Sequence, residues 1–417
     1  MFQEKNKKEA RGEPDALARR MPQARSRVVI SRCASYDRRD LSLALRRIFD
    51  SLGGLSSVVK QGSRVFVKIN HLSPSSPPER AILTHPSFTR EVLQLLSDSG
   101  AELTVGDDIY SRHPDGFSLS GYRAVCDELG VRLVNLKETG FVEVAVHGKV
   151  LKKTYIARPV VDADVIINLP KLKTHSFAIF TGAIKNMYGV IPHGLRLAYH
   201  RRYVRNDVFS QMLVDLFSCV PPQLNIMDAV VGMEGEGPSA GKPKKVGLIL
   251  ASRDAVALDA AAARVIGYGS SAIYTTVFAD ERSLGTADFR KIEVAGERLE
   301  DVVVSDFRHS AVAVSFFKRW LPSVLYAYIQ NQLTLIPEIR RVACEACLEC
   351  VSICPPRAIS LLDDAACIDE SNCIHCLCCH EICQYQAIKL KQLPLGRLLR
   401  KGDAVFKKAS AILNKRT

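Results

Sequence analysis

Two short cysteine-rich runs near the C-terminus constrain what this chain can fold into more than any other feature. Residues 344–360 read CEACLECVSICPPRAIS, and residues 373–388 read CIHCLCCHEICQYQAI. Ten of the 13 cysteines lie between positions 344 and 383. The first 26 residues are charged throughout and contain no apolar stretch of signal-peptide length, which predicts a cytoplasmic, reducing location. In such a location clustered thiols bind metal more often than they form disulfides.

Both runs follow the spacing C-x2-C-x2-C-x3-C. A cubane 4Fe–4S cluster needs four thiolates, and a tight loop with a cysteine at every third residue supplies three of them. Zinc at the CxxC spacing would leave the third and fourth cysteines of each run without a role, and disulfides are a weaker alternative still. Cys367 and Cys378 fall outside the pattern. We interpret Cys378 as a packing residue, although its place beside Cys379 leaves the register of that ligand open.

This segment resembles the bacterial two-cluster ferredoxins over residues 341–390, down to Pro355 after the first run. Gln384 stands where that family usually has a second proline, and this departure concerns local turn geometry. The resemblance implies a small α+β ferredoxin-like module with two 4Fe–4S clusters as cofactors, in which the last cysteine of each run binds the other run's cluster. The implied ligand sets are Cys344, Cys347, Cys350 and Cys383 for one cluster, and Cys373, Cys376, Cys379 and Cys354 for the other.

Apolar runs of strand length alternate with helix-length segments over residues 27–304. Segments such as DLSLALRRIFDSLGG and NDVFSQMLVDLFSCV are the helix candidates. Alternation of this kind predicts an α/β domain with a mostly parallel sheet and flanking helices, whose ligands bind at the carboxyl ends of the strands. The strand candidates are residues 27–32, 64–70, 102–108, 132–136, 163–170, 224–230 and 245–252.

Cationic side chains gather at two of these strands. One is in VFVKIN, and the others are in NLPKLKTHSFAIFTGAIKNMYG. Cations beyond strand ends are suited to hold an anionic small-molecule substrate. A strand-terminating role for Lys68 and a capping role for His175 remain open alternatives. We predict charge-stabilising or proton-transfer roles, and hence catalytic ones, for Lys68, Lys171, Lys173, His175 and Lys185.

Acidic and glycine-rich stretches near the strand ends have other interpretations. The glycine-rich segment GMEGEGPSAGKPKK lacks the G-x4-G-K-S/T pattern of a phosphate-binding loop, so we interpret it as a flexible loop that could cover the site. Four carboxylates could bind a divalent metal, but turn and capping roles are favoured for them; they are Asp107, Asp108, Asp228 and Glu234.

The large domain resembles the domain-of-unknown-function family 362, often found joined to ferredoxin modules. The matching stretches include VFVKIN, THPSF, VGDD, DADVIINLPKLKTH, TGAIKNMYGVIP, LNIMDAVVGMEGEGPSAGKP and LASRDAVALDAAAARVIG, which together span about residues 64 to 268. The resemblance implies architecture and neighbourhood, because no general activity is assigned to the family.

The remaining segments are predicted to be tails and a linker. Residues 1–26 form a basic, flexible N-terminal tail, residues 305–340 a linker helix region, and residues 391–417 a basic amphipathic C-terminal tail. Residues 341–390 carry a net charge of −4 and residues 391–417 a net charge of +7. The C-terminal tail could contact an anionic membrane surface peripherally or bind a partner, and packing on the body is the simpler alternative.

Together these features predict an iron–sulfur oxidoreductase that relays electrons between an external electron carrier or redox partner protein and an anionic substrate. A non-enzymatic electron-transfer or adaptor protein that docks to a larger complex or a membrane surface is the first alternative. A nucleic-acid-binding iron–sulfur protein is the second, suggested by the basic and aromatic segment RLAYHRRYVR. The acidic cysteine module argues against nucleic acid as a partner.

Overall fold

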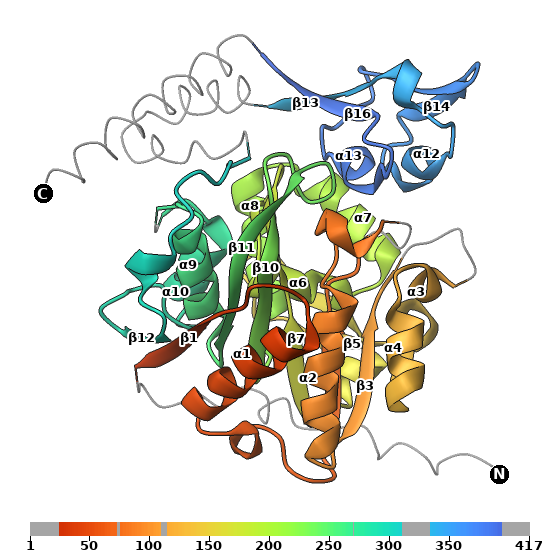
Figure 1. Ribbon diagram of the computed structural model, residues 1–417. Coiled ribbons are helices and arrows are strands. Elements are labelled where there is room, and N and C mark those ends of the chain that lie inside the picture. Colours follow the sequence, from red (N-terminus) through yellow and green to blue (C-terminus); the bar gives the residue numbers. More distant parts are fainter. Residues whose placement is uncertain (1–24, 73–75, 110–114, 270, 311–333, 394–417) are drawn as a thin grey trace, which may run out of the picture.

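The computed structural model describes residues 25–72, 76–109, 115–269, 271–310 and 334–393. They form a large α/β unit, residues 25–310, and a small cysteine unit, residues 334–393 (Figure 1). The cysteine unit lies over one end of the sheet of the large unit (Figure 1). No helix among these described residues is both long and apolar enough to cross a membrane.

The large unit is built on a ten-stranded sheet in the order β12-β1-β11-β10-β7-β2-β3-β4, with β8 paired to β10 and β9. Strands β10, β7, β2, β3 and β4 run parallel, whereas β11 runs antiparallel to both β1 and β10. The predicted α/β fold with a mostly parallel sheet is therefore confirmed. The strands are β1 Ser26–Arg32, β2 Arg64–Ile69, β3 Glu102–Asp107, β4 Arg132–Asn135, β7 Val165–Leu169, β8 Lys171–His175, β9 Ile179–Thr181, β10 Leu224–Glu234, β11 Lys242–Ser252 and β12 Ile292–Gly296.

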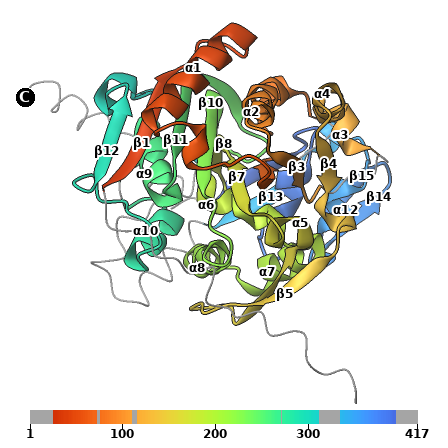
Figure 2. The ribbon, with the colours of Figure 1, turned by 90° about the horizontal axis from the view of Figure 1, so that it is seen from below.

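Strand β2 illustrates why both faces of the sheet are covered. Val65, Val67 and Ile69 are buried in one hydrophobic core, whereas Phe66 is buried in the other. Successive side chains of a strand point to opposite faces, so an uninterrupted apolar run requires cover on both sides. Helices α1, α2 and α4 cover the first face, and α6, α8 and α9 cover the second (Figure 2).

Side chains at the helix starts fix where several helices begin. At α2 the ring of His85 accepts a hydrogen bond from Ser87 N at 3.2 Å, and at α9 Asp254 accepts from Val256 N at 2.8 Å and Ala257 N at 3.0 Å. Such caps satisfy amides that have no partner within the helix. The helices are α1 Arg38–Ser51, α2 Pro86–Asp98, α3 Gly116–Leu119, α4 Tyr122–Leu129, α5 Arg158–Val161, α6 Ala183–Asn186, α7 His193–Arg202, α8 Asn206–Phe217, α9 Ala255–Val265 and α10 Tyr274–Glu281.

The cysteine unit consists of two similar halves, each a strand, a five-residue helix and a second strand. The second half repeats the first 29 positions later, since α12 begins at Glu349 and α13 at Cys378. Strand β13 pairs with β16 and β14 with β15, so each half contributes one strand to each pair. The elements are β13 Leu335–Ile339, α12 Glu349–Ile353, β14 Ile359–Leu362, β15 Ala365–Ile368, α13 Cys378–Ile382 and β16 Ile388–Gln392.

The structure corrects part of the predicted linker helix region over residues 305–340. Residues 335–339 form the strand β13, in which Leu335 and Pro337 are buried and Glu338 is exposed. Pairing with β16 determines this conformation, and the preceding apolar run does not predict it. Residues 311–333 lie outside the described residues, as do residues 1–24 and 394–417, so the predictions for both tails stay predictions.

Candidate functional site

A cavity of about 110 Å³ lies where the large unit meets the cysteine unit. It is at the carboxyl ends of the parallel strands β2 and β3, where a sheet of this type usually binds its ligand. Helices α6 and α7 supply further lining residues of the large unit, and α13 supplies most of the cysteine unit's share. The charged and apolar lining residues include Lys68, Asp107, Asp108, Lys185, Arg196, Leu197, Ile353, Cys378, Glu381 and Ile382.

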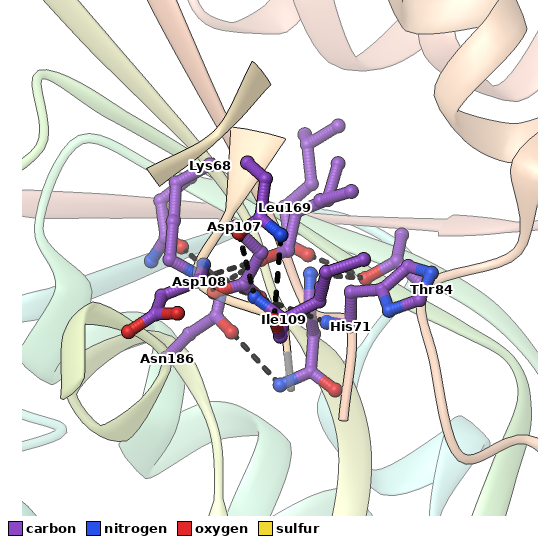
Figure 3. A network of polar contacts seen from close by, with 12 residues as sticks. Lys68, His71, Thr84, Asp107, Asp108, Ile109, Leu169 and Asn186 are labelled. Carbon is purple, nitrogen blue, oxygen red and sulfur yellow. Dashed lines mark hydrogen bonds and ion pairs between the residues drawn. The ribbon is translucent and has the colours of Figure 1, made fainter. Parts of the chain in front are cut away.

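Lys68 forms a buried ion pair in the cavity wall. Its Nζ lies 2.8 Å from Asp107 Oδ2 and also donates to the Ile69 carbonyl at 2.6 Å (Figure 3). Asp107 in turn accepts from the backbone amides of His71 at 2.9 Å and Asp108 at 2.8 Å. Burial lowers the pKa of Lys68, and the charge of Asp107 opposes this shift. The pair is therefore held as a unit at the ends of β2 and β3.

Gly189 allows the backbone after α6 to pack directly on this ion pair. A Cβ atom at Gly189 would lie 2.3 Å from Asp107 Oδ1 and 2.8 Å from Lys68 Nζ, closer than atoms can approach. The glycine of the KNMYG segment is thus required by a close approach between backbone and side chains.

A ladder of asparagine side chains runs from the sheet interior to Lys173. Lys173 Nζ donates to Asn70 Oδ1 at 2.7 Å, and Asn70 Nδ2 donates to Asn186 Oδ1 at 2.8 Å. Asn186 Nδ2 donates to Asn168 Oδ1 at 2.7 Å, and Asn168 Nδ2 donates to Asn225 Oδ1 at 2.9 Å. Each amide orients the next, which fixes the position of the buried lysine. The sequence signal that could have identified Asn168 is a single asparagine inside the otherwise apolar strand β7.

His175 connects the large unit to the cysteine unit. Its Nδ1 accepts hydrogen bonds from Phe177 N and Ala178 N, both at 3.0 Å, so its proton lies on Nε2. That Nε2 lies 3.3 Å from Glu381 Oε1 in α13. Burial, and then the charge of Lys185, lower the pKa of His175 well below its usual value, which keeps the ring neutral. His175 is therefore a neutral residue that faces a carboxylate.

Lys185 lies on α6 and lines the cavity. Its helix is anchored by Asp259, which accepts from Ala183 N at 2.6 Å and Ile184 N at 3.1 Å. Burial lowers the pKa of Lys185, the charge of Glu381 opposes this shift, and Arg196 adds to it. Within the described part of the chain no carboxylate oxygen lies within ion-pair distance of the Lys185 amine.

Lys171 lies outside the cavity, in a closed buried cluster. Its Nζ is 2.7 Å from Asp228 Oδ2 and 2.7 Å from the Tyr36 hydroxyl, and both ionic side chains are fully buried. Asp228 also accepts from His85 N at 2.9 Å, and the Tyr36 and His85 rings stack with centroids 3.7 Å apart. Of the five predicted catalytic residues, the structure thus places Lys68 and Lys185 in the cavity wall, Lys173 and His175 against lining residues, and Lys171 elsewhere.

Arg196, the first residue of the basic and aromatic segment 196–205, lines the cavity. Its guanidinium lies 3.0 Å from Asp108 Oδ2 and donates to the Asp108 carbonyl at 2.8 Å. Tyr199 and Tyr203 of the same segment are buried in the main hydrophobic core. Because these rings are enclosed, this segment does not present the interleaved basic and aromatic surface that binds nucleic acid.

The candidate carboxylates have protein partners in place of a metal. Asp107, Asp108 and Asp228 pair with lysine or arginine, and Glu234 accepts from Arg308 N at 2.9 Å. Among the described residues, no three His, Cys, Asp or Glu side chains are placed to hold a single metal ion.

Buried neutral histidines make the stability depend on pH. Burial is the largest cause that lowers the pKa of His71 to about 4 and of His200 to about 3, from 6.5. The unfolded chain binds these protons near pH 6.5 while the folded chain does not, so stability is lost as the pH falls from 6.5 towards 4. Each such histidine contributes about 1.4 kcal/mol per pH unit over this range.

We expect His200→Gln to make the loss of unfolding free energy with falling pH less steep by about that amount. Urea unfolding between pH 7 and pH 5 measures the slope. The exposed His147 provides a matched control, and His147→Gln should leave the slope unchanged. Equal slopes for wild type and His200→Gln would show that His200 is not held neutral.

The thiols of the cysteine unit fall into two groups. Cys344, Cys347, Cys350 and Cys383 line one small cavity. Burial, followed by the three neighbouring thiols, raises the pKa of Cys350 to about 12. The fourth thiol of this group comes from the second cysteine run.

The second group contains Cys373, Cys376, Cys379 and Cys354. Burial raises the pKa of Cys379 well above its usual value, and the thiols of Cys376, Cys350, Cys373 and Cys354 add to this shift. Burial also raises the pKa of Cys354, and the thiols that add to that shift are those of Cys376 and Cys373, so the fourth thiol of this group comes from the first run. Cys378 is buried, hydrogen-bonds to the Cys376 thiol and lines the cavity between the two units.

The loops that carry the two groups have matching backbone conformations. Ala346 and His375 have φ values of 47° and 53°, and Leu348 and Leu377 have φ values of 62° and 63°. These left-handed residues are uncommon outside glycine and occupy equivalent positions in the two halves. Backbone strain of this kind, repeated in both loops, is typical of loops that each hold a similar ligand.

The glycine-rich loop between β10 and β11 joins the two units and does not form an open lid. Glu236 O lies 3.3 Å from His380 Nε2, and the Ser239 hydroxyl donates to His380 O at 3.2 Å. Arg80 donates to Gln384 O at 2.8 Å and to Ser239 O at 3.1 Å. The expected flexible loop is thus a docking element, because a backbone carbonyl and a buried hydroxyl of the loop contact His380 of α13, and Arg80 links the loop to Gln384.

The family model described as a domain of unknown function, DUF362, matches residues 65–264. A curated relative, the thylakoid-associated protein sll1697 of Synechocystis sp., is 32% identical over 234 residues, which cover 56% of this chain and 72% of the relative.

Two solved structures are also similar. The lactate racemase apoprotein of Thermoanaerobacterium thermosaccharolyticum has a TM-score of 0.35 and 13% identity over 56% of this chain and 55% of its own. A protein from Thermotoga maritima has a TM-score of 0.32 and 13% identity over 52% of this chain and 55% of its own. The chain spans about half the length of these two structures. By its family match and its curated relative, this chain belongs to the DUF362 family.

Proposed function

We propose that this protein is an iron–sulfur redox enzyme that holds two 4Fe–4S clusters in its cysteine unit. Electrons would pass between these clusters and an anionic compound bound in the cavity between the two units. One observation carries the proposal: α13 supplies both a wall of the cavity and the thiol of Cys379 in the second cysteine group.

The donor set fits the proposed clusters. Each group offers four thiols, as a 4Fe–4S cluster requires, and the thiol that completes each group comes from the other run. Backbone amides already face two of these sulfurs, with Ala358 N 3.2 Å from Cys354 Sγ and Ala366 N 3.5 Å from Cys344 Sγ. Amide donors of this kind stabilise sulfur-bound negative charge. When bound, the clusters supply one-electron transfer.

The residues of the large unit would hold the compound against the cysteine unit. Lys185 and Arg196 line the cavity with cationic groups, and Lys68 is held beside them by Asp107. Cys378 and Glu381 line the opposite wall. A bound anion would therefore lie beside the segment that carries the second cysteine group. The Lys68–Asp107 pair is buried, and the low dielectric around it strengthens its electrostatic interactions.

The test is anaerobic purification followed by iron and sulfide analysis and electron paramagnetic resonance. We expect about eight irons and about eight sulfides per chain, with signals typical of reduced 4Fe–4S clusters. A preparation with about four irons per chain, or with zinc in their place, would contradict the two-cluster assignment.

A non-enzymatic carrier at a membrane surface is the second candidate, and the name of the relative, a thylakoid-associated protein, favours it. The protein would then lie on the cytoplasmic side, contact the membrane peripherally through the basic residues 391–417 and exchange electrons with a partner protein. Co-sedimentation with anionic vesicles measures this contact. Deletion of residues 394–417 should abolish binding and leave the iron content unchanged, and unchanged sedimentation would contradict the membrane role.

A further inference from the structure

We propose that the cavity between the units binds a small monoanion, best matched by a carboxylate, and that Lys185 is the residue that pairs with it. This inference rests on the proposed function, because it names the substrate class of the same site.

Lysine and arginine side chains outnumber carboxylates around the cavity. Within the described residues, four cations and three carboxylates act on this site. In two ion pairs the charges of the partners cancel. Lys68 lies 2.8 Å from Asp107, and Arg196 lies 3.0 Å from Asp108. The remaining titratable groups are Glu381, Lys173 and Lys185. Burial lowers the pKa of both lysines and raises that of Glu381, and the charge of Glu381 opposes the shift of each lysine.

The histidines nearby do not change this balance. His175 is neutral because its Nδ1 accepts two backbone amides. His71 and His200 are deeply buried, and burial lowers the pKa of each to about 4 and about 3. The histidines therefore add no charge to the site at neutral pH. A lysine of the site without a carboxylate partner is costly to keep charged until a counter-charge arrives.

Geometry identifies Lys185 as the unmatched cation. The Lys173 amine is committed to the protein, since it donates to Asn70 Oδ1 and to the Ile82 carbonyl, and it does not line the cavity. Lys185 does line the cavity, and within the described part of the chain its amine has neither an ion pair nor a hydrogen bond. An anion in the cavity would supply both.

Further polar atoms of the cavity lack partners. Thr181 Oγ1, His200 Nδ1 and Arg196 Nε are buried without a hydrogen bond among the described residues, and so are Asp108 Oδ1 and Glu381 Oε1. Buried polar groups normally have a partner. The oxygen atoms of a ligand would accept from the first three groups, and the two carboxylate oxygens would accept from water or from a hydroxyl group of the ligand. Leu197, Ile353 and Ile382 line the rest and suit a short apolar body.

Size limits the ligand further. The cavity of about 110 Å³ is well below the roughly 300 Å³ at which pockets for drug-sized ligands begin. A nucleotide would be only partly enclosed by it, whereas a small acid fits within the enclosed part. A second carboxylate on the ligand would face Glu381 and the paired aspartates, which favours a single negative charge.

The experiment compares small acids with their neutral amides on the full-length, anaerobically purified chain. Acetate, crotonate and benzoate are each titrated beside acetamide, crotonamide and benzamide by calorimetry. We expect at least one acid to bind and its amide not to bind. Succinate, a dianion, should bind more weakly than the best monoanion. Absence of binding by all three acids, or equal binding by an acid and its amide, overturns the inference.

Two substitutions should change the affinity in opposite directions. Lys185→Gln removes the counter-charge and should raise Kd at least about tenfold, whereas Glu381→Gln removes the competing carboxylate and should lower Kd several-fold. The exposed Lys60 gives a matched control, and Lys60→Gln should leave Kd unchanged. Weaker binding by both Lys185→Gln and Glu381→Gln would overturn the assignment of the charge.

Folding and iron content are measured on the same samples. If Lys185→Gln does not fold, Lys185→Arg takes its place, because arginine keeps the positive charge. Its Kd should stay within a few-fold of the wild-type value. Failure of Lys185→Arg to bind the acid would count against the inference. A chain with about eight irons that binds no acid contradicts this inference alone. A chain without iron that binds an acid through Lys185 contradicts only the proposed clusters.

Discussion

Cys383→Ala is expected to leave about four irons per chain, and so is Cys354→Ala, but the two variants should retain different clusters. The reason is the interlocked grouping, in which Cys383 lies with the thiols of the first run and Cys354 with those of the second. Paramagnetic resonance of the reduced proteins identifies which cluster remains.

A matched set of variants makes this comparison decisive. Cys383→Ala should give the same residual spectrum as Cys347→Ala, although the two residues lie in different runs. Cys354→Ala should match Cys376→Ala. The exposed Cys367 lies outside both groups, so Cys367→Ala should keep about eight irons. If Cys383→Ala instead matches Cys376→Ala, each run holds its own cluster and the interlocked assignment is wrong.

Lys171→Met should lower the free energy of unfolding by about 3 to 5 kcal/mol. The substitution leaves Asp228 as an uncompensated buried charge, because both side chains of the pair are fully buried. Urea unfolding measures the loss. The affinity of the folded fraction for small acids should be unchanged, since Lys171 does not line the cavity.

The double variant Lys171→Met with Asp228→Leu tests the cause of that loss. Removing both charges should recover part of the stability, although the amides of His85 and Val230 lose their acceptor. A loss below about 1 kcal/mol in Lys171→Met, together with loss of acid binding, would show that Lys171 acts on the ligand, as the sequence analysis predicts.

Most of the sheet could be predicted from apolar runs, because the apolar run of a strand buried on both faces, such as RVFVKI in β2, is nearly continuous in the sequence. The hairpin of β5, Phe141–Ala145, and β6, Lys153–Ala157, was not predicted. Its strands are half exposed and mix charged with apolar residues. Strand β8 was missed for a different reason, since its lysines are buried only because distant residues pair with them.

The site was predictable in its cations but not in their partners. Lys68 and Lys185 could be identified because cations follow buried strands. Asp107, which pairs with Lys68, and Glu381, whose charge acts on Lys185, could not be assigned to them, because these residues lie far apart in the chain. The duplication of the cysteine unit, by contrast, is visible in the sequence because cysteine spacing repeats at a fixed interval.

The shared wall of the cavity has a thermodynamic consequence. Because α13 and the strand ends of the large unit both contact the same space, the cavity exists only while the two units are docked. Any molecule that binds there stabilises the docked arrangement by mass action, and docking in turn raises its affinity by the same factor. We therefore expect linkage in both directions. Occupancy of the cavity should slow the release of iron from the cysteine unit, and loss of iron should lower the affinity of the cavity for the molecule that occupies it.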